Sequence, residues 1–182
     1  VGGKTLIDHS IDRLVAAGVK RVVVNVHYKA EMLQAHLAKR RDVEIVFSDE
    51  TAQLLDTGGG VVKAMPYFGD RSFFVINSDS IWVENSPALA AMLAGWDEKR
   101  MDGLLLLAEM STAIGYDAQG DFILRPDGHV VRARGNSGAS GAGAASTMSS
   151  ASARRSGAGT SWPTIGSSST GSASGPRSSA PS

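Results

Sequence analysis

The sequence contains no cysteine. This absence excludes a disulfide framework and a thiolate metal site, and it fits a cytosolic protein, because structural disulfides persist mainly in oxidising compartments. The sequence also lacks any apolar run that approaches the roughly 20 residues needed to span a bilayer, and its first residues do not form a secretory signal peptide. We therefore expect a cytoplasmic protein that does not enter a membrane.

The last part of the sequence lacks most of the residues that build a folded core. Residues 135–182 contain no Asp, Glu, Leu, Val, Phe or Tyr, and Ser, Gly and Ala dominate them. Such a segment cannot bury enough apolar surface to offset the chain entropy lost on folding. We predict a folded domain over residues 1–134 and a low-complexity, disordered tail over residues 135–182.

Charge is balanced over the whole chain but not within the predicted domain. The chain has 18 Lys and Arg against 18 Asp and Glu, and three of the arginines, Arg154, Arg155 and Arg177, are the tail's only charges, so the rest carries −3. A mildly acidic domain does not present the basic surface that binds nucleic acid. We expect no nucleic-acid partner.

Helical and strand patterns alternate along the domain. The helical patterns cover residues 5–17, 29–39 and 87–96, and the short apolar runs that indicate buried strands cover residues 21–26, 43–47, 73–76 and 103–108. Two further short strands, 121–124 and 129–132, flank a Pro-Asp-Gly turn typical of a hairpin. This order predicts an α/β fold: a Rossmann-like, mostly parallel sheet with helices on both faces, ending in an antiparallel hairpin.

The strand at residues 73–76 is followed by a carboxylate. Asn77 and Ser78 end the apolar run, and Asp79 comes where the strand would emerge from the sheet. Ligands of open α/β sheets bind beyond the carboxyl ends of the strands, so Asp79 is a candidate metal ligand. A role in a turn stays open as the alternative, because Ser-Asp-Ser is also good turn chemistry.

A glycine triplet, Gly58-Gly59-Gly60, lies between the strand at 43–47 and an apolar helical turn. Glycines leave the main chain uncovered, so a flat base or a phosphate can approach it closely, and the N-terminus of the following helix favours an anion. We interpret the triplet as part of a ligand-binding loop. The alternative is a loop that is only flexible.

Two other motifs are shorter and less specific. Asp56-Thr57-Gly58 matches the signature of aspartic proteases, but those enzymes need two such carboxylates and the flanking patterns here alternate between helix and strand. Gly3-Lys4-Thr5 matches the last three residues of a Walker A loop, with Asp79 as a possible Walker B carboxylate. A P-loop NTPase therefore remains an alternative, as does a non-catalytic nucleotide-binding module.

Four stretches of the domain carry a common pattern in their order and spacing: VGGKTLIDHSIDRLVAAGVKRVVVNVHY, DETAQLLDTGGGVVKAMPYFG, FFVINSDSIW and GYDAQGDFILRPDGHVVR. Together they resemble the sugar-1-phosphate nucleotidyltransferases, especially the N-acetylmuramate-1-phosphate uridylyltransferases and the mannose-1-phosphate guanylyltransferase-like proteins. The resemblance covers residues 1 to about 134. It implies the nucleotide-diphospho-sugar transferase type of fold, a nucleoside triphosphate and a sugar 1-phosphate as substrates, Mg²⁺ as cofactor, and a place in nucleotide-sugar synthesis for the cell wall.

The resemblance also implies roles for individual residues. Asp79 would bind Mg²⁺, Gly58 and Gly59 would contact the base through the backbone, and Asn77 would support the nucleotide site at the end of the strand. Gly120 and Asp121 fall where the family contacts the sugar phosphate. No catalytic residue can be assigned, because the catalytic lysine and arginine of the family would precede Val1.

The sequence departs from the family pattern at both ends. The glycine-rich signature is missing before Val1, and residues 135–182 hold no acidic residue where a second Mg²⁺-binding Asp is expected. We expect an N-terminally truncated chain with a frameshift near residue 135, because a GC-rich gene read out of frame gives a Ser-, Ala-, Gly- and Arg-rich sequence; a genuine disordered extension is the alternative. As written, the chain is expected to have little or no activity.

Overall fold

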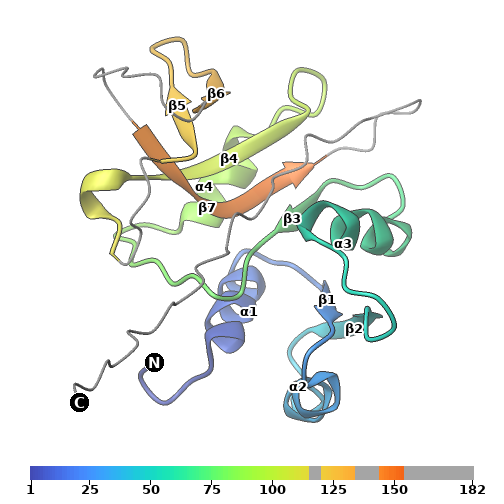
Figure 1. Cartoon of the computed structure of the whole chain (residues 1–182). Helices are drawn as coiled ribbons and strands as arrows, with labels where there is room; N and C mark the ends of the chain where they lie inside the picture. The colour runs from blue at the N-terminus through green and yellow to red at the C-terminus, as the bar shows by residue number, and fades with distance from the viewer. Residues whose placement is uncertain (115–119, 134–143, 154–182) are drawn as a thin grey trace, which may run out of the picture.

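The structure is a computed structural model of the chain, and it describes residues 1–114, 120–133 and the backbone of 144–153. Helices and strands alternate along the first half of the chain, which confirms the predicted α/β class (Figure 1). In order, the elements are α1 (Leu6–Ala16), β1 (Arg21–Val26), α2 (Ala30–Leu37), β2 (Glu44–Asp49), α3 (Thr57–Ala64), β3 (Phe73–Val75), α4 (Ala88–Gly95), β4 (Gly103–Glu109), β5 (Phe122–Leu124), β6 (Val130–Arg132) and β7 (Ala144–Ala153).

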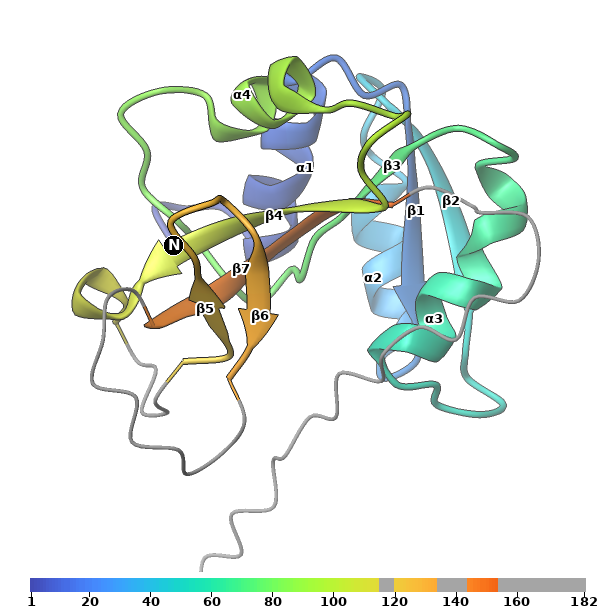
Figure 2. The same cartoon turned by 90° about the horizontal axis from the view of Figure 1, so that it is seen from above.

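Strands β1 and β2 form a parallel pair, in register from Arg21 opposite Glu44 to Val26 opposite Asp49. Helices α2 and α3 lie on opposite sides of this pair (Figures 1 and 2). A parallel pair needs a crossover connection, and α2 supplies it. The carboxyl ends of both strands therefore meet at one edge, which is the edge where the sequence predicts a ligand site.

The second sheet corrects the prediction of a mostly parallel arrangement. Strand β7 pairs antiparallel with β3, β4 and β5, and β5 pairs antiparallel with β6. Among the described strands, only β1 and β2 pair in parallel. The reason is that β7 lies between β3 and β4 and runs in the opposite direction to both. Strands β3 and β4 therefore run in the same direction without pairing with each other, and no parallel ladder forms.

Strand β7 comes from within the predicted tail. Residues Ala144–Ala153 lie inside the segment predicted to be disordered, yet they form β7. A ladder is made of backbone N–H and C=O groups, so a Ser- and Ala-rich sequence can complete it without an apolar face of its own. The rest of the predicted tail lies outside the described residues. The hairpin of β5 and β6 is present as predicted, with Gly128 at φ +83° in its turn.

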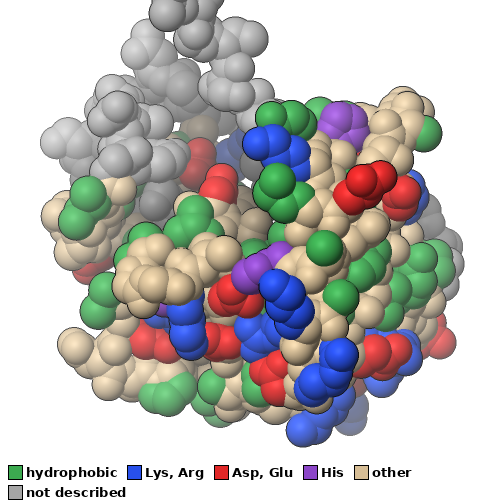
Figure 3. Space-filling view, turned by 90° about the horizontal axis from the view of Figure 1, so that it is seen from below, with side chains coloured by type: hydrophobic (Ala, Val, Ile, Leu, Met, Phe, Trp, Pro, Cys, Tyr) green, Lys and Arg blue, Asp and Glu red, His purple; other side chains and the backbone are tan. Residues whose placement is uncertain are grey.

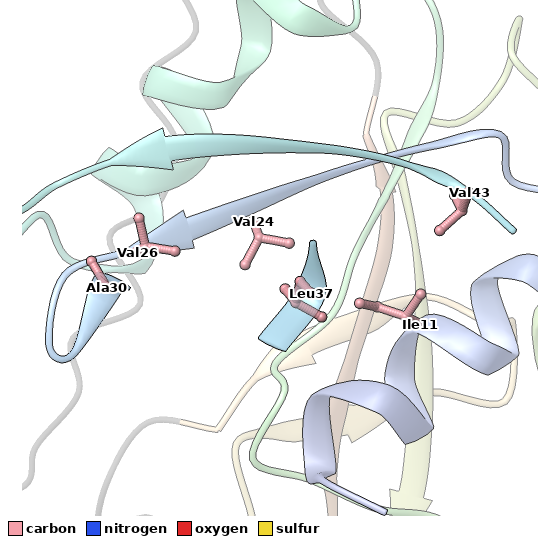
Figure 4. Close-up of a cluster of buried hydrophobic side chains, with 6 residues drawn as sticks. All are labelled: Ile11, Val24, Val26, Ala30, Leu37 and Val43. Carbon is pink, nitrogen blue, oxygen red and sulfur yellow. The ribbon is translucent and has the colours of Figure 1, made fainter. Parts of the chain in front are cut away.

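The core is divided into two clusters of buried side chains. The first joins α1, β1 and α2, and the second joins α1 to the segment after β3 and to α4. Figure 4 shows the side chains of the first cluster, namely Ile11, Val24, Val26, Ala30, Leu37 and Val43. The second consists of Leu14, Trp82, Leu89 and Met92. Helix α1 contributes to both clusters because Ile11 and Leu14, three residues apart, lie on one apolar stripe.

Charged side chains connect the start of α1 to the turn after α2. The Arg40 guanidinium lies 3.1 Å from Asp8, 2.7 Å from Asp12 and 2.6 Å from Asp42, and only 14% of its side chain is exposed. His36 Nε2 lies 2.7 Å from Asp8 Oδ2. Acidic, basic and histidine side chains lie among one another on the face shown in Figure 3. None of the helices within the described ranges is long and apolar enough to cross a membrane.

The pKa of Asp8 makes this cluster a source of pH-dependent stability. Burial acts to raise the pKa of Asp8, but hydrogen bonds from Thr5, His36 and Arg40 outweigh it and lower the pKa from 3.8 to about 2. A lowered pKa in the folded state means that the stabilisation is fully present above the ordinary value and is lost as the pH falls through about 2. We expect the free energy of unfolding to fall by about 2 kcal/mol between pH 5 and pH 2 through this group.

Urea unfolding at several pH values measures this effect. Asp8→Asn should be less stable than the unsubstituted chain at pH 5, and the difference should shrink towards pH 2. Asp70→Asn, in an exposed turn before β3, is the control and should keep the pH dependence of the unsubstituted chain. A constant difference between Asp8→Asn and the unsubstituted chain across this range would contradict the prediction.

Candidate functional site

A cavity of about 1040 Å³ lies between β1 and β3. Consecutive residues of both strands line it, over Arg21–Asn25 on one side and 72–79 on the other, together with the N-terminal turn of α3 and part of α1. Successive side chains of a strand point to opposite faces, so a cavity lined by consecutive residues borders the edge of each strand as well as one face. Its volume lies slightly above the usual range for small-molecule sites, about 300–1,000 Å³.

Polar residues gather where this cavity meets the carboxyl ends of the strands. The lining there consists of Asn25 at the end of β1, Glu50 directly after β2, Asp56 and Thr57 at the start of α3, and Asn77, Ser78 and Asp79 after β3. Apolar residues such as Val22, Val24 and Phe74 line much of the remainder. An apolar cavity with a few converging polar groups is the usual form of a small-molecule site.

The glycine triplet lies inside α3 and not in a loop, which corrects one detail of the prediction. Asp56 is the N-cap of the helix, and its Oδ1 accepts a hydrogen bond of 3.1 Å from the N–H of Gly59. This cap stabilises a helical start that glycines alone would disfavour. Gly60 lines the cavity, whereas Gly58 and Gly59 lie beside its lining residues in the same turn.

Glu50 is a buried carboxylate that is not among the site residues predicted from the sequence. Its residue is 4% exposed, and its two oxygens accept hydrogen bonds from the Asn25 side chain at 2.6 Å and from the N–H of Leu55 at 3.1 Å. Asn25 also donates to the carbonyl of Gly60 at 3.0 Å. One signal was available in the sequence: an acidic residue soon after a buried strand, at the edge where Asn25 lies next to the last residue of the preceding strand.

The neighbouring carboxylate of Asp49 is exposed at the same edge. The N–H of Thr51 lowers the pKa of Asp49, with further contributions from Lys63 and His27. The ammonium group of Lys63 donates to the backbone carbonyl of Asp49. Basic side chains thus accompany the carboxylates at the carboxyl ends of β1 and β2.

Asp79 lies at the exposed mouth of the cavity, with Asn77 and Ser78 beside it. Its Oδ1 accepts a hydrogen bond of 3.3 Å from the Ser80 hydroxyl, and its carboxylate is open to solvent. Exposed oxygen donors suit Mg²⁺, which binds through one or two carboxylates and keeps several waters or substrate oxygens. Within the described ranges, no three His, Cys, Asp or Glu side chains gather as a ready-made metal cage.

The segment that carries Asp79 contacts α1 through Trp82. The Arg13 guanidinium lies 4.2 Å from the centre of the indole ring and donates to the Trp82 carbonyl. Glu84 accepts hydrogen bonds from Trp82 Nε1 at 2.9 Å and from the N–H of Ala88 at 3.0 Å. These contacts fix the chain three residues beyond Asp79, so they limit how far the carboxylate can move.

Gly120 and Asp121 are not among the residues that line the cavity. Gly120 has φ +94° just before β5, and the Asp121 carbonyl accepts a hydrogen bond of 2.8 Å from Ala133. They belong to the β5–β6 hairpin, and residues 115–119 before them lie outside the described residues. Their role towards a sugar phosphate stays a prediction.

Comparison with known proteins gives the following likenesses. Residues 1–116 match the family described as nucleotidyl transferase. The chain is 48% identical over 135 residues to an N-acetylmuramate alpha-1-phosphate uridylyltransferase of Caulobacter vibrioides, covering 71% of this chain and 56% of the relative. A protein of the same description from Neisseria meningitidis is 30% identical over 132 residues, with shares of 71% and 55%. The chain thus spans about half the length of these relatives.

Two further likenesses are more distant. A mannose-1-phosphate guanyltransferase of Hypocrea jecorina is 41% identical over 83 residues, which are 43% of this chain and 22% of the relative. The crystal structure of an apo UDP-glucose pyrophosphorylase superposes with a TM-score of 0.58 at 11% sequence identity, covering 83% of this chain and 65% of that chain. At this identity the superposition shows a shared fold and nothing about the reaction.

Proposed function

Because the chain belongs to the nucleotidyl transferase family, we propose that the cavity between β1 and β3 binds the nucleoside triphosphate of a sugar-1-phosphate nucleotidyltransferase. The observation that carries the proposal is the placement of Asn77, Asp79 and the first turn of α3 on one cavity, at the carboxyl ends of the strands. Ligands of α/β sheets bind at this edge.

In the proposed reaction, a phosphate oxygen of the sugar 1-phosphate attacks the α-phosphorus of the triphosphate. A new P–O bond forms there, the bond to the bridging oxygen breaks, and pyrophosphate leaves with the electron pair. The protein contributes positioning and charge neutralisation. Mg²⁺, when bound, would neutralise charge on the phosphates, and Asp79 would hold it, with Asn77 supporting the nucleotide beside it.

The glycines would act mainly by leaving space. At Gly58 a Cβ would lie 3.8 Å from the nearest atom, an oxygen of Asp56, so the backbone there is open to a flat base. At Gly59 the N–H already donates to Asp56, and a Cβ would lie 3.1 Å from the Cβ of Leu55. This glycine therefore also makes room for Leu55, and its proposed contact with the base would be through the backbone. Gly120 and Asp121 are proposed to contact the sugar phosphate.

The likeness to the uridylyltransferases is longer than that to the guanyltransferase, and this favours UTP over GTP as the nucleotide. By the same argument we propose N-acetylmuramate 1-phosphate as the sugar substrate, and a cytoplasmic role in supplying a nucleotide sugar for the cell wall. A nucleotide-binding module without catalysis is the alternative. It would bind nucleotide equally well with and without Mg²⁺.

Calorimetric titration of the purified 182-residue chain with UTP, in Mg²⁺ and in EDTA, tests the proposal. We expect binding that is roughly tenfold tighter or more in Mg²⁺, and weaker binding of GTP. A parallel assay of pyrophosphate release with N-acetylmuramate 1-phosphate measures turnover, and we expect little or no release from this chain, because no catalytic residue is assigned to it. Equal UTP binding in Mg²⁺ and EDTA would favour the non-catalytic module, and no UTP binding in either would overturn the proposal.

A further inference from the structure

The carboxylate of Glu50 is buried among neutral groups in the part of the chain that the structure describes. Within the described residues no Lys, Arg or His forms an ion pair with it, and its residue is only 4% exposed. Burying a charged group is costly unless hydrogen bonds satisfy it. Both oxygens are satisfied by neutral donors, the Asn25 amide and the N–H of Leu55, so the geometry of these two donors is tightly specified.

Glu50 organises the segment that leads from β2 to α3. Its carbonyl accepts a hydrogen bond of 3.1 Å from the N–H of Gln53, and its side chain reaches the N–H of Leu55. Its own N–H donates to the Val26 carbonyl at 2.7 Å, which ties the segment to the end of β1. Glu50 therefore holds this segment at two points, Gln53 and Leu55, directly before Asp56, the N-cap of α3.

Asn25 connects the same carboxylate to the first turns of α3. Its Nδ2 donates to Glu50 at 2.6 Å and to the Gly60 carbonyl at 3.0 Å. The helix approaches so closely that a Cβ at Gly60 would lie 3.0 Å from both Asn25 Nδ2 and Glu50 Oε1. Glycine at this position is thus required by the polar pair, whereas a Cβ at Gly58 would meet only an ordinary contact.

We infer that Glu50 and Asn25 are positioning residues for the nucleotide: through their hydrogen bonds to Leu55 and Gly60 they hold the N-terminal turn of α3 at the distance from β1 that the nucleotide needs. This inference rests on the proposed function. All of the groups concerned, Asn25, Glu50, Leu55 and Gly60, line the cavity. Apolar side chains of similar size could fill the same space, but they would not fix the orientation of a helix terminus through directed hydrogen bonds.

Glu50→Gln tests the inference with little change of shape. The amide group that replaces one oxygen faces a donor whichever way it turns, either the Asn25 amide or the N–H of Leu55. We expect the affinity for UTP with Mg²⁺ to fall roughly tenfold or more, and amide hydrogen exchange at residues 51–60 to become faster. Glu31→Gln, which removes a carboxylate from the exposed surface of α2, should change neither measurement.

Gly60→Ala is the second variant, because it keeps both polar side chains and disturbs only their fit against α3. It should reproduce the loss of affinity, and Gly95→Ala, where a Cβ meets nothing within 4 Å, should not. Amide exchange outside residues 50–60 shows whether each variant remains folded.

The outcomes separate the inference from the proposed function. Unchanged UTP affinity in folded Glu50→Gln and Gly60→Ala, while the unsubstituted chain binds UTP, overturns the inference and leaves the proposed function in place. No UTP binding by the unsubstituted chain overturns the proposed function and the nucleotide part of the inference. If Glu50→Gln leaves the rate of amide exchange at residues 51–60 unchanged, the other part of the inference, that Glu50 orders this segment, is overturned.

Discussion

Replacing Trp82 with alanine is expected to lower the free energy of unfolding by about 3–5 kcal/mol. Trp82 is 6% exposed and belongs to the second core cluster, with Leu14, Leu89 and Met92. Its truncation removes the largest side chain of that cluster, the face on which the Arg13 guanidinium lies at 4.2 Å, and the donor to Glu84. Arg13 and Glu84 then keep their charges but lose the partner that organises them, which adds to the cost of the cavity.

Two variants serve as references for this measurement, which uses urea unfolding followed by far-UV circular dichroism. Val83→Ala changes the next residue, which is 95% exposed, and should stay within about 0.5 kcal/mol of the unsubstituted chain. Trp82→Phe keeps an aromatic ring but loses the Nε1 donor, and should cost about 1–3 kcal/mol. If Trp82→Ala costs no more than Val83→Ala, the segment after β3 is not anchored as described.

Asp79→Asn is expected to weaken Mg²⁺-dependent binding of UTP by roughly 10- to 100-fold. The amide keeps the shape of the side chain but is a much weaker ligand for Mg²⁺ than a carboxylate, and substitutions even of groups that only support a metal ligand cost about this much. Asp79 is exposed and accepts only the Ser80 hydroxyl among the described hydrogen bonds. Its substitution should therefore leave stability within about 0.5 kcal/mol of the unsubstituted chain.

Calorimetric titration with UTP in Mg²⁺ and in EDTA separates a metal role from a general one. In EDTA the Asp79→Asn variant and the unsubstituted chain should bind alike, because the carboxylate then has no ion to hold. Asp70→Asn removes an exposed carboxylate from the turn before β3 that is not itself among the residues lining the cavity, and should bind as the unsubstituted chain does in both conditions. An equal loss in EDTA would exclude Asp79 as a metal ligand.

The sequence predicts the local elements of the first half of the chain well. Apolar spacing predicts a helix over 5–17 and a strand over 21–26, and the structure has Leu6–Ala16 and Arg21–Val26. These elements are decided by periodicity within the segment itself, because α1 shows one apolar stripe and β1 one short buried run. The position of Asp79 after a strand could also be predicted, because the sequence shows where the apolar run before it ends.

The features that the sequence does not predict depend on partners far along the chain or on a single cap. The glycine triplet becomes helical because Asp56 caps it, although its composition favours a loop. Strand β7 forms because it pairs through its backbone with β3, β4 and β5, and no apolar pattern in its sequence predicts a strand. The importance of Glu50 follows from its burial beside Asn25, 25 residues earlier, which composition cannot show.

The two core clusters differ in how much of the chain must be present before they can close. All buried members of the first, from Ile11 to Val43, come from one short stretch that forms α1, β1 and α2. The second requires Leu14 to meet Trp82, Leu89 and Met92 across a long intervening segment. Closing a longer loop costs more entropy, and contacts of large sequence separation form more slowly. On a ribosome the first cluster can therefore assemble early, and the cavity walled by β1 and β3 is completed only when the later segment has emerged.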